Sequence, residues 1–309
     1  MHSWTLHDMP DLTGTTAVVT GANSGIGAVT ALVLARSGAR TLLACRDPER
    51  GRRAVDAVRR AAPQADARLV RLDLADLSSV AEAAEQIVGE TGGRLDLLVN
   101  NAGVMALPPL RTADGFEMQF GTNHLGHFAL TLRLLPALGV QGPARVVTLS
   151  SLGHRLGRID LDDLNAERGY SKWRAYGQSK LANLLFTTEL DRRARAAGRD
   201  LVALAAHPGL SSTDLGQAGL LLAGRTWAAR LERVSRLYTQ PASVGALPVL
   251  YAATLPGARG GSYYGPAHLG ETRGRPAPAR RSRPAQDMAT ARALWDASAR
   301  LTGLSADAL

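Results

Sequence analysis

A β-branched run that ends in closely spaced glycines constrains this chain most strongly. Residues 15–20 read Thr-Thr-Ala-Val-Val-Thr, which is typical of a buried parallel strand, and a helical pattern covers residues 28–37. The turn between them contains Gly21, Gly25 and Gly27. Glycines permit a tight turn and let the backbone approach a pyrophosphate at a helix amino terminus. The turn therefore predicts a dinucleotide-binding site, with an ordinary glycine-rich loop as the alternative.

Strand-like and helical segments alternate along the rest of the chain. This alternation predicts an α/β protein with a Rossmann-like, doubly wound parallel sheet and helices on both faces. The further expected strands are Thr41–Ala44, Arg68–Leu72, Leu95–Val99, Ala144–Leu149, Leu201–Ala206 and Gly261–Tyr264. The further expected helices are Glu49–Ala62, Ser78–Val88, Gly115–Leu135, one that carries Tyr176, and Ala242–Thr254.

The chain of 309 residues is expected to form a single domain. Residues 12–206 are its predicted dinucleotide-binding and catalytic core. Residues 210–240 interrupt the pattern with a cluster of leucines and Trp227, and they are expected to form a small helical insertion that covers the substrate. Simple packing of those leucines against the fold is the alternative. Residues 270–309 form a C-terminal extension, in which the proline-interleaved arginines of residues 273–283 predict an exposed loop.

Composition limits the partners of this protein. A formal net charge of +9 is compatible with nucleic acid, but the arginines are scattered among alanine-rich helices, where solvated faces are the usual explanation, so no nucleic-acid partner is expected. No apolar run approaches the ~20 residues of a membrane span, and no stable membrane insertion is expected. A single cysteine, Cys45, excludes an internal disulfide and suits a cytoplasmic location. The histidines lack partners at metal-ligand spacing, and no metal is predicted.

Tyr176 and Lys180 are four positions apart and would share one face of a helix. A phenol loses its proton near pH ~10, and a neighbouring cation lowers that pKa, so Tyr176 could exchange a proton with an alcohol or carbonyl oxygen at neutral pH. Lysine occurs only at Lys172 and Lys180, and the remaining basic residues are all arginine. This usage favours a chemical role for Lys180, although a surface tyrosine beside a solvated lysine has the same spacing.

Polar residues follow several strands, at the edge where open parallel sheets bind ligands. Arg46 follows the second strand and precedes Asp47. Because an arginine there accommodates a 2′-phosphate, NADP(H) is predicted over NAD, with a solvated Arg46 as the alternative. Asp73 closes the third strand, where its carboxylate could bind adenine or cap the next helix. Asn100 follows the fourth strand, and Asn123 lies inside a predicted helix, where its poor helix propensity indicates a buried polar role.

These motifs occur together in the order found in one family of enzymes. From Leu12 to Tyr264 the chain resembles the short-chain dehydrogenases/reductases and, within them, the NADP-dependent retinol-dehydrogenase-like branch. The combination is highly specific for the family. The matching positions are Thr20-Gly21-x-x-x-Gly25-x-Gly27, Asp73, Asn100-Asn101-Ala102-Gly103, Asn123, Ser151, Tyr176-x-x-x-Lys180 and Pro208-Gly209.

The resemblance implies roles for individual residues. Tyr176 would be the general acid/base, Ser151 would orient and polarise the substrate oxygen, and Lys180 would lower the pKa of the tyrosine and hold the nicotinamide ribose. Asn123 would bind a water that links Lys180 to solvent. The implied cofactor contacts are Gly21, Asn23, Ser24, Gly25, Ile26, Gly27, Arg46, Asp73, Leu74, Asn100, Ala102, Gly103, Tyr176, Lys180, Pro208, Gly209 and Leu210. The expected substrate contacts are Ser151, Met105, His154 and Tyr176.

Resemblance and residue chemistry together predict an NADP(H)-dependent oxidoreductase that interconverts a ketone or aldehyde and an alcohol on an apolar, fairly bulky substrate. Carbonyl reduction is the expected direction in a reducing cytoplasm. A reductase of a conjugated carbon–carbon double bond is one alternative, and a non-catalytic NADP-binding scaffold is another. The resemblance also implies pairing through the helices of Asn123 and Tyr176, which leaves a homodimer and a monomer as alternatives.

Overall fold

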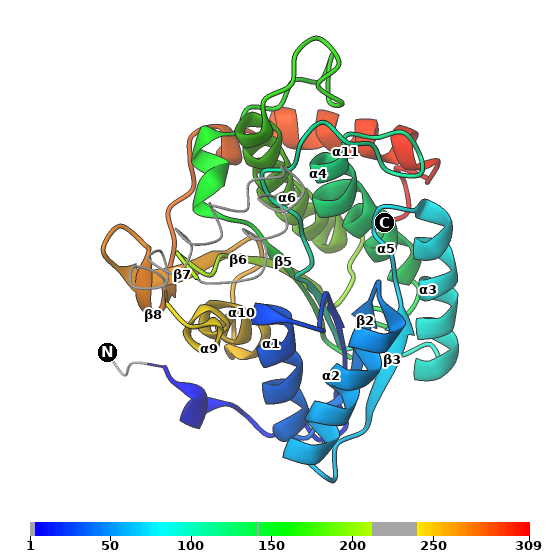
Figure 1. Cartoon of the computed structure of the whole chain (residues 1–309), viewed down its shortest axis with the longest axis vertical. Coiled ribbons are helices and arrows are strands. Elements are labelled where there is room, and N and C mark those ends of the chain that lie inside the picture. Colours follow the sequence, from blue (N-terminus) through cyan, green and yellow to red (C-terminus); the bar gives the residue numbers. More distant parts are fainter. Residues whose placement is uncertain (1–3, 141, 212–239) are drawn as a thin grey trace.

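A single eight-stranded sheet forms the centre of the protein. The computed structural model describes residues 4–140, 142–211 and 240–309. The strand order is β3-β2-β1-β4-β5-β6-β7-β8, and the first seven strands are parallel (Figure 1). The order reverses between β1 and β4, which creates a switch point where such sheets bind ligands. The strands are β1 (Thr16–Thr20), β2 (Arg40–Cys45), β3 (Ala67–Arg71), β4 (Leu97–Asn100), β5 (Ala144–Leu149), β6 (Leu201–Ala206), β7 (Tyr263–His268) and β8 (Arg273–Pro278).

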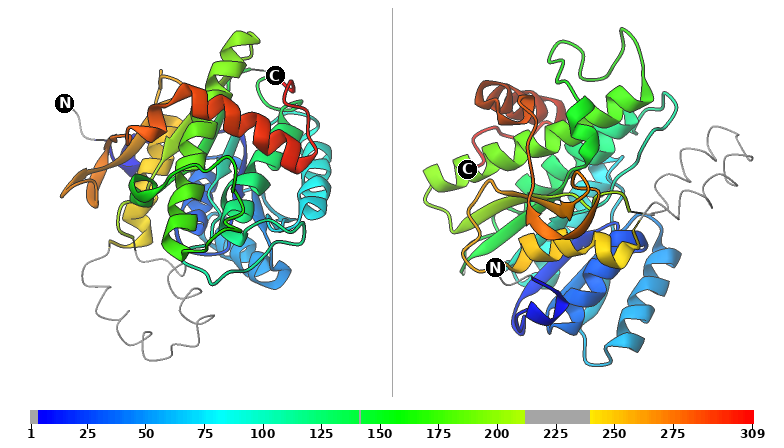
Figure 2. Two further views of the ribbon diagram at one scale, coloured as in Figure 1. Left: turned by 90° about the horizontal axis from the view of Figure 1, so that it is seen from above. Right: turned by 90° about the vertical axis from the view of Figure 1, so that its left-hand side faces the viewer.

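Helices cover both faces of the sheet, which confirms the predicted doubly wound α/β fold (Figures 1 and 2). Val18 and Val19 are both fully buried and belong to the cores on opposite faces, as expected for a parallel strand. Within the described ranges, no helix has the length and apolar character needed to cross a membrane. One face carries α1 (Gly25–Arg36), α2 (Pro48–Ala61), α9 (Ala242–Gly245) and α10 (Leu247–Thr254). The other carries α3 (Leu77–Thr91), α5 (Gly126–Leu134), α6 (Lys172–Ala196) and α11 (Met288–Thr302).

The last strand departs from the sequence prediction. β8 pairs antiparallel with β7, so the segment 273–283, which was predicted to be an exposed loop, is in part an edge strand. The prediction was wrong because Pro276 and Pro278 are unfavourable inside a sheet, whereas an edge strand tolerates residues without an N–H on its open side. Prolines on this edge also make pairing with a strand of another molecule unfavourable.

The predicted helix over residues 115–135 is shorter and irregular. It begins as α4 (Met118–Phe120), where the carboxylate of Glu117 accepts the backbone N–H groups of Gln119 and Phe120. A π-helical turn, η2 (Gly121–Leu125), follows and leads into α5. Such π-turns are rare and occur frequently at functional sites. The turn carries Asn123, for which the sequence predicts a buried polar role because asparagine is unfavourable inside a helix.

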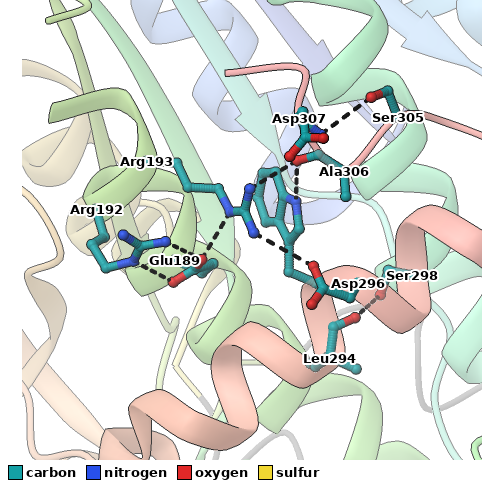
Figure 3. A network of polar contacts seen from close by, with 10 residues as sticks. Glu189, Arg192, Arg193, Leu294, Asp296, Ser298, Ser305, Ala306 and Asp307 are labelled. Atoms are coloured by element: carbon teal, nitrogen blue, oxygen red, sulfur yellow. Dashed lines mark hydrogen bonds and ion pairs between the residues drawn. The ribbon is translucent and has the colours of Figure 1, made fainter. Parts of the chain in front are cut away.

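The C-terminal extension contains a helix that was not predicted. α11 lies across α6, and the two helices meet in an aromatic cluster in which Trp295 stacks on Phe186 at a centroid distance of 5.9 Å (Figure 2). The guanidinium of Arg193 lies 4.8 Å from the centroid of the Trp295 ring and donates to the carbonyl of Ala306, while Glu189 binds Arg193 from the other side (Figure 3). These contacts fix α11 to the helix that carries Tyr176 and Lys180.

The predicted substrate-covering insertion, with Trp227 and its leucines, lies almost wholly outside the described residues. Its described ends lie side by side, because Ser211 and Gln240 form an isolated parallel bridge and the Gln240 N–H donates to the carbonyl of Leu210 at 2.8 Å. The two described ends of this segment therefore meet at one point of the fold.

Candidate active site

The glycine turn packs tightly against the end of β4. Gly21 and Gly25 have φ angles of +65° and +53°, which suit residues without a Cβ. A Cβ at Gly27 would lie 2.4 Å from both the Asn101 side-chain nitrogen and the carbonyl oxygen of Gly21. The Asn101 amide in turn donates to the carbonyl of Thr20 at 2.7 Å. The turn and the segment after β4 thus form one packed unit at the switch point, and only glycine fits at position 27.

The amino terminus of α1 differs from those of three other helices. α2, α3 and α11 are each preceded by an aspartate that caps the helix, with a carboxylate that accepts two backbone N–H groups. The residue before α1 is Ser24, whose side chain makes no capping hydrogen bond, and the first turn of α1 contains no acidic residue. A helix amino terminus without a carboxylate favours an external anion. Together with the glycine cradle, this end of α1 fits the pyrophosphate of a dinucleotide.

At the end of β2, Arg46 and Asp47 have different environments. Both are exposed, but the Asp47 carboxylate caps α2 by accepting the N–H groups of Glu49 and Arg50 at 2.9 and 3.0 Å. These backbone hydrogen bonds hold the pKa of Asp47 below its usual value. The carboxylate is therefore engaged in the helix cap, while Arg46 is exposed at the end of the strand whose Ala44 carbonyl accepts the N–H of Gly21 in the glycine turn.

Asp73, which follows β3, and Asn100, which ends β4, are both hydrogen-bonded inside the protein. Asp73 does not cap α3, since Asp76 fills that position, and its carboxylate accepts the N–H of Ala75 at 3.0 Å. The Asn100 side chain is buried and donates to the hydroxyl of Thr131 at 3.0 Å. Its amide nitrogen therefore ties β4 to α5, while its side-chain oxygen is buried and has no hydrogen-bond partner among the described residues.

Lys180 lies in a buried cradle between α6, β5 and the segment after β4. Only 5% of its surface is exposed, and its ammonium donates to the carbonyl of Leu149 at 3.2 Å. A Cβ at Gly103 would lie 3.3 Å from the Lys180 nitrogen, so the glycine backbone borders the same cradle. Burial lowers the pKa of Lys180 to about 8. The ammonium is thus largely protonated at neutral pH and is placed next to the predicted cofactor segment.

Ser151 and Tyr176 are brought together by a close approach of two backbones. A Cβ at Gly157 would lie 2.2 Å from the carbonyl oxygen of Gly177, so the end of η3 (Leu152–Leu156) rests directly on α6. A Cβ at Gly153 would lie 3.5 Å from Oγ of Ser151 and 2.8 Å from Cε1 of Tyr176, so the two side chains flank the same glycine, and the Lys180 nitrogen is 5.9 Å from the centroid of the tyrosine ring. The two hydroxyls can therefore address a single substrate oxygen.

The pKa of Tyr176 differs from the expectation. Burial raises it above its usual value, and the Ser151 side chain opposes that shift. Burial thus outweighs the lowering by Lys180 that the resemblance implied, although the Lys180 nitrogen lies 5.9 Å from the centroid of the ring. Tyr176 therefore carries its proton at neutral pH, which suits a proton donor.

Asn123 holds the segment after β4 rather than facing an open space. Its side-chain oxygen accepts the N–H of Val104 at 2.7 Å, and its amide donates to the Val104 carbonyl at 2.9 Å and to the hydroxyl of Ser179 at 2.9 Å. The side-chain oxygen keeps a second lone pair that could accept from a water, so the water that the resemblance implies stays a prediction. Asn123 also clamps the segment next to Gly103 onto α6.

The expected substrate contacts divide into two groups. Met105 is half-buried in the segment that Asn123 holds. His154, by contrast, is fully buried, and both ring nitrogens are bonded inside the protein, to Ser151 and to Ser282. The expectation that His154 lines the substrate cavity is therefore not supported. The C-terminal extension covers this residue, and the sequence does not reveal that contact.

The turn after β6 rests on the β7–β8 connection. A Cβ at Gly209 would lie 2.3 Å from the carbonyl oxygen of Thr272, and the Leu210 N–H donates to that same oxygen at 2.9 Å. Pro208 is half-buried, whereas 49% of Leu210 is exposed. Leu210 is therefore an exposed apolar residue at this turn, and its contact with a cofactor stays a prediction.

Two functional positions were missed in the sequence. The Thr20 hydroxyl accepts the N–H groups of Asn101 and Ala102, both at 2.9 Å, and lies 2.9 Å from Nε2 of His127. The other ring nitrogen of His127 is 3.0 Å from the carbonyl of Asn123, so these two residues connect the dinucleotide turn to η2. Thr20 was recognised only as a matching position of the glycine motif, without a role of its own, whereas the partners of His127 depend on the fold. Among the described residues, no group of three or more His, Cys, Asp or Glu could hold a metal ion.

Comparisons with known proteins agree with this geometry. A family model for short chain dehydrogenases matches residues 15–219. Retinol dehydrogenase 13 of Homo sapiens is 44% identical over 296 residues, which cover 95% of this chain and 86% of that protein. A solved structure of an uncharacterized protein from Mycobacterium Paratuberculosis is 45% identical and has a TM-score of 0.81. The match covers 98% of this chain and 99% of that one.

Two more distant solved structures contain a nicotinamide cofactor. A short chain dehydrogenase from Shigella flexneri 2a str. 301, complexed with NADP, is 22% identical with a TM-score of 0.63, over 83% of this chain and 98% of that one. A short chain dehydrogenase/reductase from Burkholderia phymatum, in complex with NAD, is 26% identical with a TM-score of 0.61, and the match covers 79% of this chain and 87% of that one. On the strength of the family model and the high identity to curated relatives, this chain belongs to the short-chain dehydrogenase family and, within it, to the retinol-dehydrogenase-like branch.

Proposed function

We propose that this protein reduces the carbonyl group of an apolar, fairly bulky ketone or aldehyde with NADPH, and that Tyr176 donates the proton. The family is one of oxidoreductases that use nicotinamide cofactors and interconvert alcohols and carbonyl compounds. The observation that carries the finer proposal is that the side chains of Ser151 and Tyr176 meet at Gly153, where a Cβ would lie 3.5 Å from the serine Oγ and 2.8 Å from the tyrosine Cε1, one helical turn from the buried ammonium of Lys180.

The residues of the site fit a nicotinamide dinucleotide. A cradle that any Cβ at Gly27 would fill, the α1 terminus without a carboxylate cap, and the Lys180 ammonium beside Gly103 offer sites for a pyrophosphate and a ribose. When bound, NADPH would supply a hydride to the substrate carbon. Support for NADP over NAD comes from Arg46, which is exposed at the strand end while Asp47 is engaged in the cap of α2.

The chain's own groups supply the acid part of the chemistry. The Ser151 hydroxyl and the Tyr176 hydroxyl can both donate to the carbonyl oxygen, which polarises it and fixes its position. Tyr176 then transfers its proton to the oxygen as negative charge develops there. The cation of Lys180 stabilises the resulting phenolate, since opposite charges attract strongly in a buried site. Asn123 keeps the segment at Val104 in place during these steps.

Exposed apolar side chains near the reacting groups support an apolar substrate. Trp173 is 51% exposed, and its ring lies 6.5 Å from the ring of Tyr176. Leu156, in the turn that begins after Ser151, is 73% exposed. Exposed large apolar residues that come from separate segments and flank polar reacting groups are typical of a ligand site.

The experiment that tests the function follows NADPH oxidation with a panel of apolar aldehydes and ketones, and identifies the product by mass and by ultraviolet spectrum. We expect an alcohol as the product, and consumption of NADPH that depends on the carbonyl compound. A product that has lost a conjugated double bond while keeping its carbonyl would instead identify a double-bond reductase. Tight NADPH binding without turnover of any panel member would favour the non-catalytic scaffold.

Replacement of Arg46 by alanine tests the choice of cofactor. A charge-assisted hydrogen bond to a phosphate contributes about 1.5–3 kcal/mol, so we expect the Kd for NADPH to rise roughly 10–100-fold, and the Kd for NADH to stay nearly constant. Binding would be measured by calorimetry, with Arg52→Ala on the exposed side of α2 as the matched control. Equal weakening of both cofactors in Arg46→Ala would contradict a 2′-phosphate contact.

A further inference from the structure

The C-terminal hairpin, which we define as residues 263–282, holds two parts of the site at once. The turn after β6 is bonded to it because the Leu210 N–H donates to the carbonyl of Thr272 at 2.9 Å. The turn η3, which begins after Ser151, is bonded to it because Arg155 donates to the carboxylate of Glu271 at 2.7 Å. These two contacts lie at adjacent residues of the hairpin, 271 and 272.

His154 forms a third and more deeply buried connection. Its Nδ1 lies 2.6 Å from the carbonyl oxygen of Ser151, and its Nε2 lies 3.2 Å from the backbone nitrogen of Ser282. A carbonyl oxygen can only accept and a backbone N–H can only donate, so Nδ1 carries the ring proton and Nε2 is bare. The two partners therefore specify one neutral tautomer. The ring also contacts Tyr263 edge-on, at a centroid distance of 5.7 Å.

Glu271 stands at the centre of the remaining contacts. Its φ of +69° lies in the left-handed region, which is costly for a residue with a Cβ and often occurs where geometry serves function. One carboxylate oxygen binds Arg155 and lies 3.4 Å from Nε2 of His207, while the other accepts the N–H of Arg280 at 3.0 Å. The hairpin is thus bonded to the rest of the protein on its inner side, next to His154 and the turn after β6.

We propose that His154 is a positioning residue that ties the backbone of the catalytic Ser151 to the C-terminal hairpin. The Nδ1–H of His154 and its backbone N–H both donate to the Ser151 carbonyl, at 2.6 and 3.0 Å, and so fix the backbone from which the serine hydroxyl extends. The role of His154 in catalysis rests on the proposed carbonyl reduction. A reacting group that is displaced by about 1 Å can lose about 10²-fold in rate, so this anchoring has a measurable effect.

Three variants separate the two hydrogen bonds of His154. His154→Phe keeps an aromatic ring beside Tyr263 and removes both bonds. His154→Asn places an amide N–H near the position of Nδ1–H, and so can restore the bond to Ser151 without the bond to Ser282. Ser282→Ala is the matched control, because the backbone N–H remains and the Ser282 hydroxyl has no hydrogen-bond partner within the described part of the chain.

The first readout is the split between kcat and KM in the carbonyl assay. We expect His154→Phe to lower kcat about 10–100-fold with the Kd for NADPH nearly unchanged, His154→Asn to recover most of that loss, and Ser282→Ala to match the unmodified protein. Equal kcat values for the Phe and Asn variants would overturn the proposal. A loss of kcat that only follows a loss of folded protein, measured by circular dichroism, would also overturn it.

The second readout needs no substrate. Amide hydrogen exchange of the peptide that covers residues 151–156 should be faster in His154→Phe than in the unmodified protein, and should return toward the original rate in His154→Asn. Unchanged exchange in His154→Phe would refute the anchoring of Ser151. If the unmodified protein turned over no carbonyl compound, the proposed function would fail, while the exchange comparison would still decide whether His154 anchors this turn.

Discussion

Replacement of Tyr176 by phenylalanine is expected to lower kcat for carbonyl reduction by about 10²–10⁴-fold, the usual contribution of a positioned general acid. The variant keeps the ring that packs beside Trp173 and removes only the hydroxyl, which carries its proton at neutral pH because burial raises the pKa of Tyr176. Since the hydroxyl acts only when charge develops on the substrate oxygen, kcat and kcat/KM should fall together. The measurement is steady-state NADPH oxidation with the best member of the carbonyl panel.

The interpretation of Tyr176→Phe requires two controls. Calorimetric titration with NADPH should give nearly the same Kd as for the unmodified protein, which shows that the cofactor site is intact. Tyr170→Phe is the matched variant, since it removes a hydroxyl that binds the Leu107 carbonyl at 2.8 Å, outside the reacting cluster. Its kcat should fall far less than that of Tyr176→Phe. An unchanged kcat in Tyr176→Phe would remove Tyr176 from its assigned role.

Replacement of Trp295 by alanine is expected to lower the free energy of unfolding by about 3–5 kcal/mol, as for other large buried aromatic residues. Trp295 is 2% exposed, stacks on Phe186, meets Phe128 edge-on at 5.0 Å, and donates from its indole nitrogen to the carbonyl of Ala306 at 3.0 Å. Alanine would leave a cavity between α11 and α6 and remove the ring over which the Arg193 guanidinium lies (Figure 3). Urea unfolding, followed by circular dichroism, measures the change.

Two further tryptophan variants define the range of the effect. Trp173→Ala removes a half-exposed indole and should change the free energy of unfolding by about 0.5 kcal/mol or less, as is usual for surface substitutions. Trp295→Phe should lie between the other two, because it keeps a ring but loses the hydrogen bond to Ala306. A stability of Trp295→Ala similar to that of Trp173→Ala would show that α11 contributes little to the fold.

The regular part of the fold could be predicted from the sequence because its signals are local. The strands before Gly21 and before Asn100 are short apolar runs, and such runs are typical of strands that are buried on both faces. The helix α1 follows a glycine turn and ends at Arg36, two residues before the left-handed Gly38 with φ of +97°. Each of these elements can be predicted from residues that are close together in the sequence.

The parts that were missed depend on contacts between distant segments. β8 becomes a strand because it finds the open edge of β7, which outweighs the poor strand propensity of Pro276 and Pro278. The amide of Asn100 turns toward Thr131 because α5 lies against β4. The raised pKa of Tyr176 reflects burial, which spacing along one helix does not reveal. The identities of the site residues were readable from their motif, whereas their bonding partners were set by tertiary packing.

The packing of α11 on α6 has a consequence for association between molecules. α6 is buried along most of its length, and part of that cover is supplied by a helix of the same chain (Figure 2). A second molecule that approached this side of α6 would meet α11 first. Because the covering helix is covalently attached, its effective concentration at the contact is set by the connecting loop and not by the amount of protein in solution. The helix of Tyr176 and Lys180 thus keeps this support at any dilution.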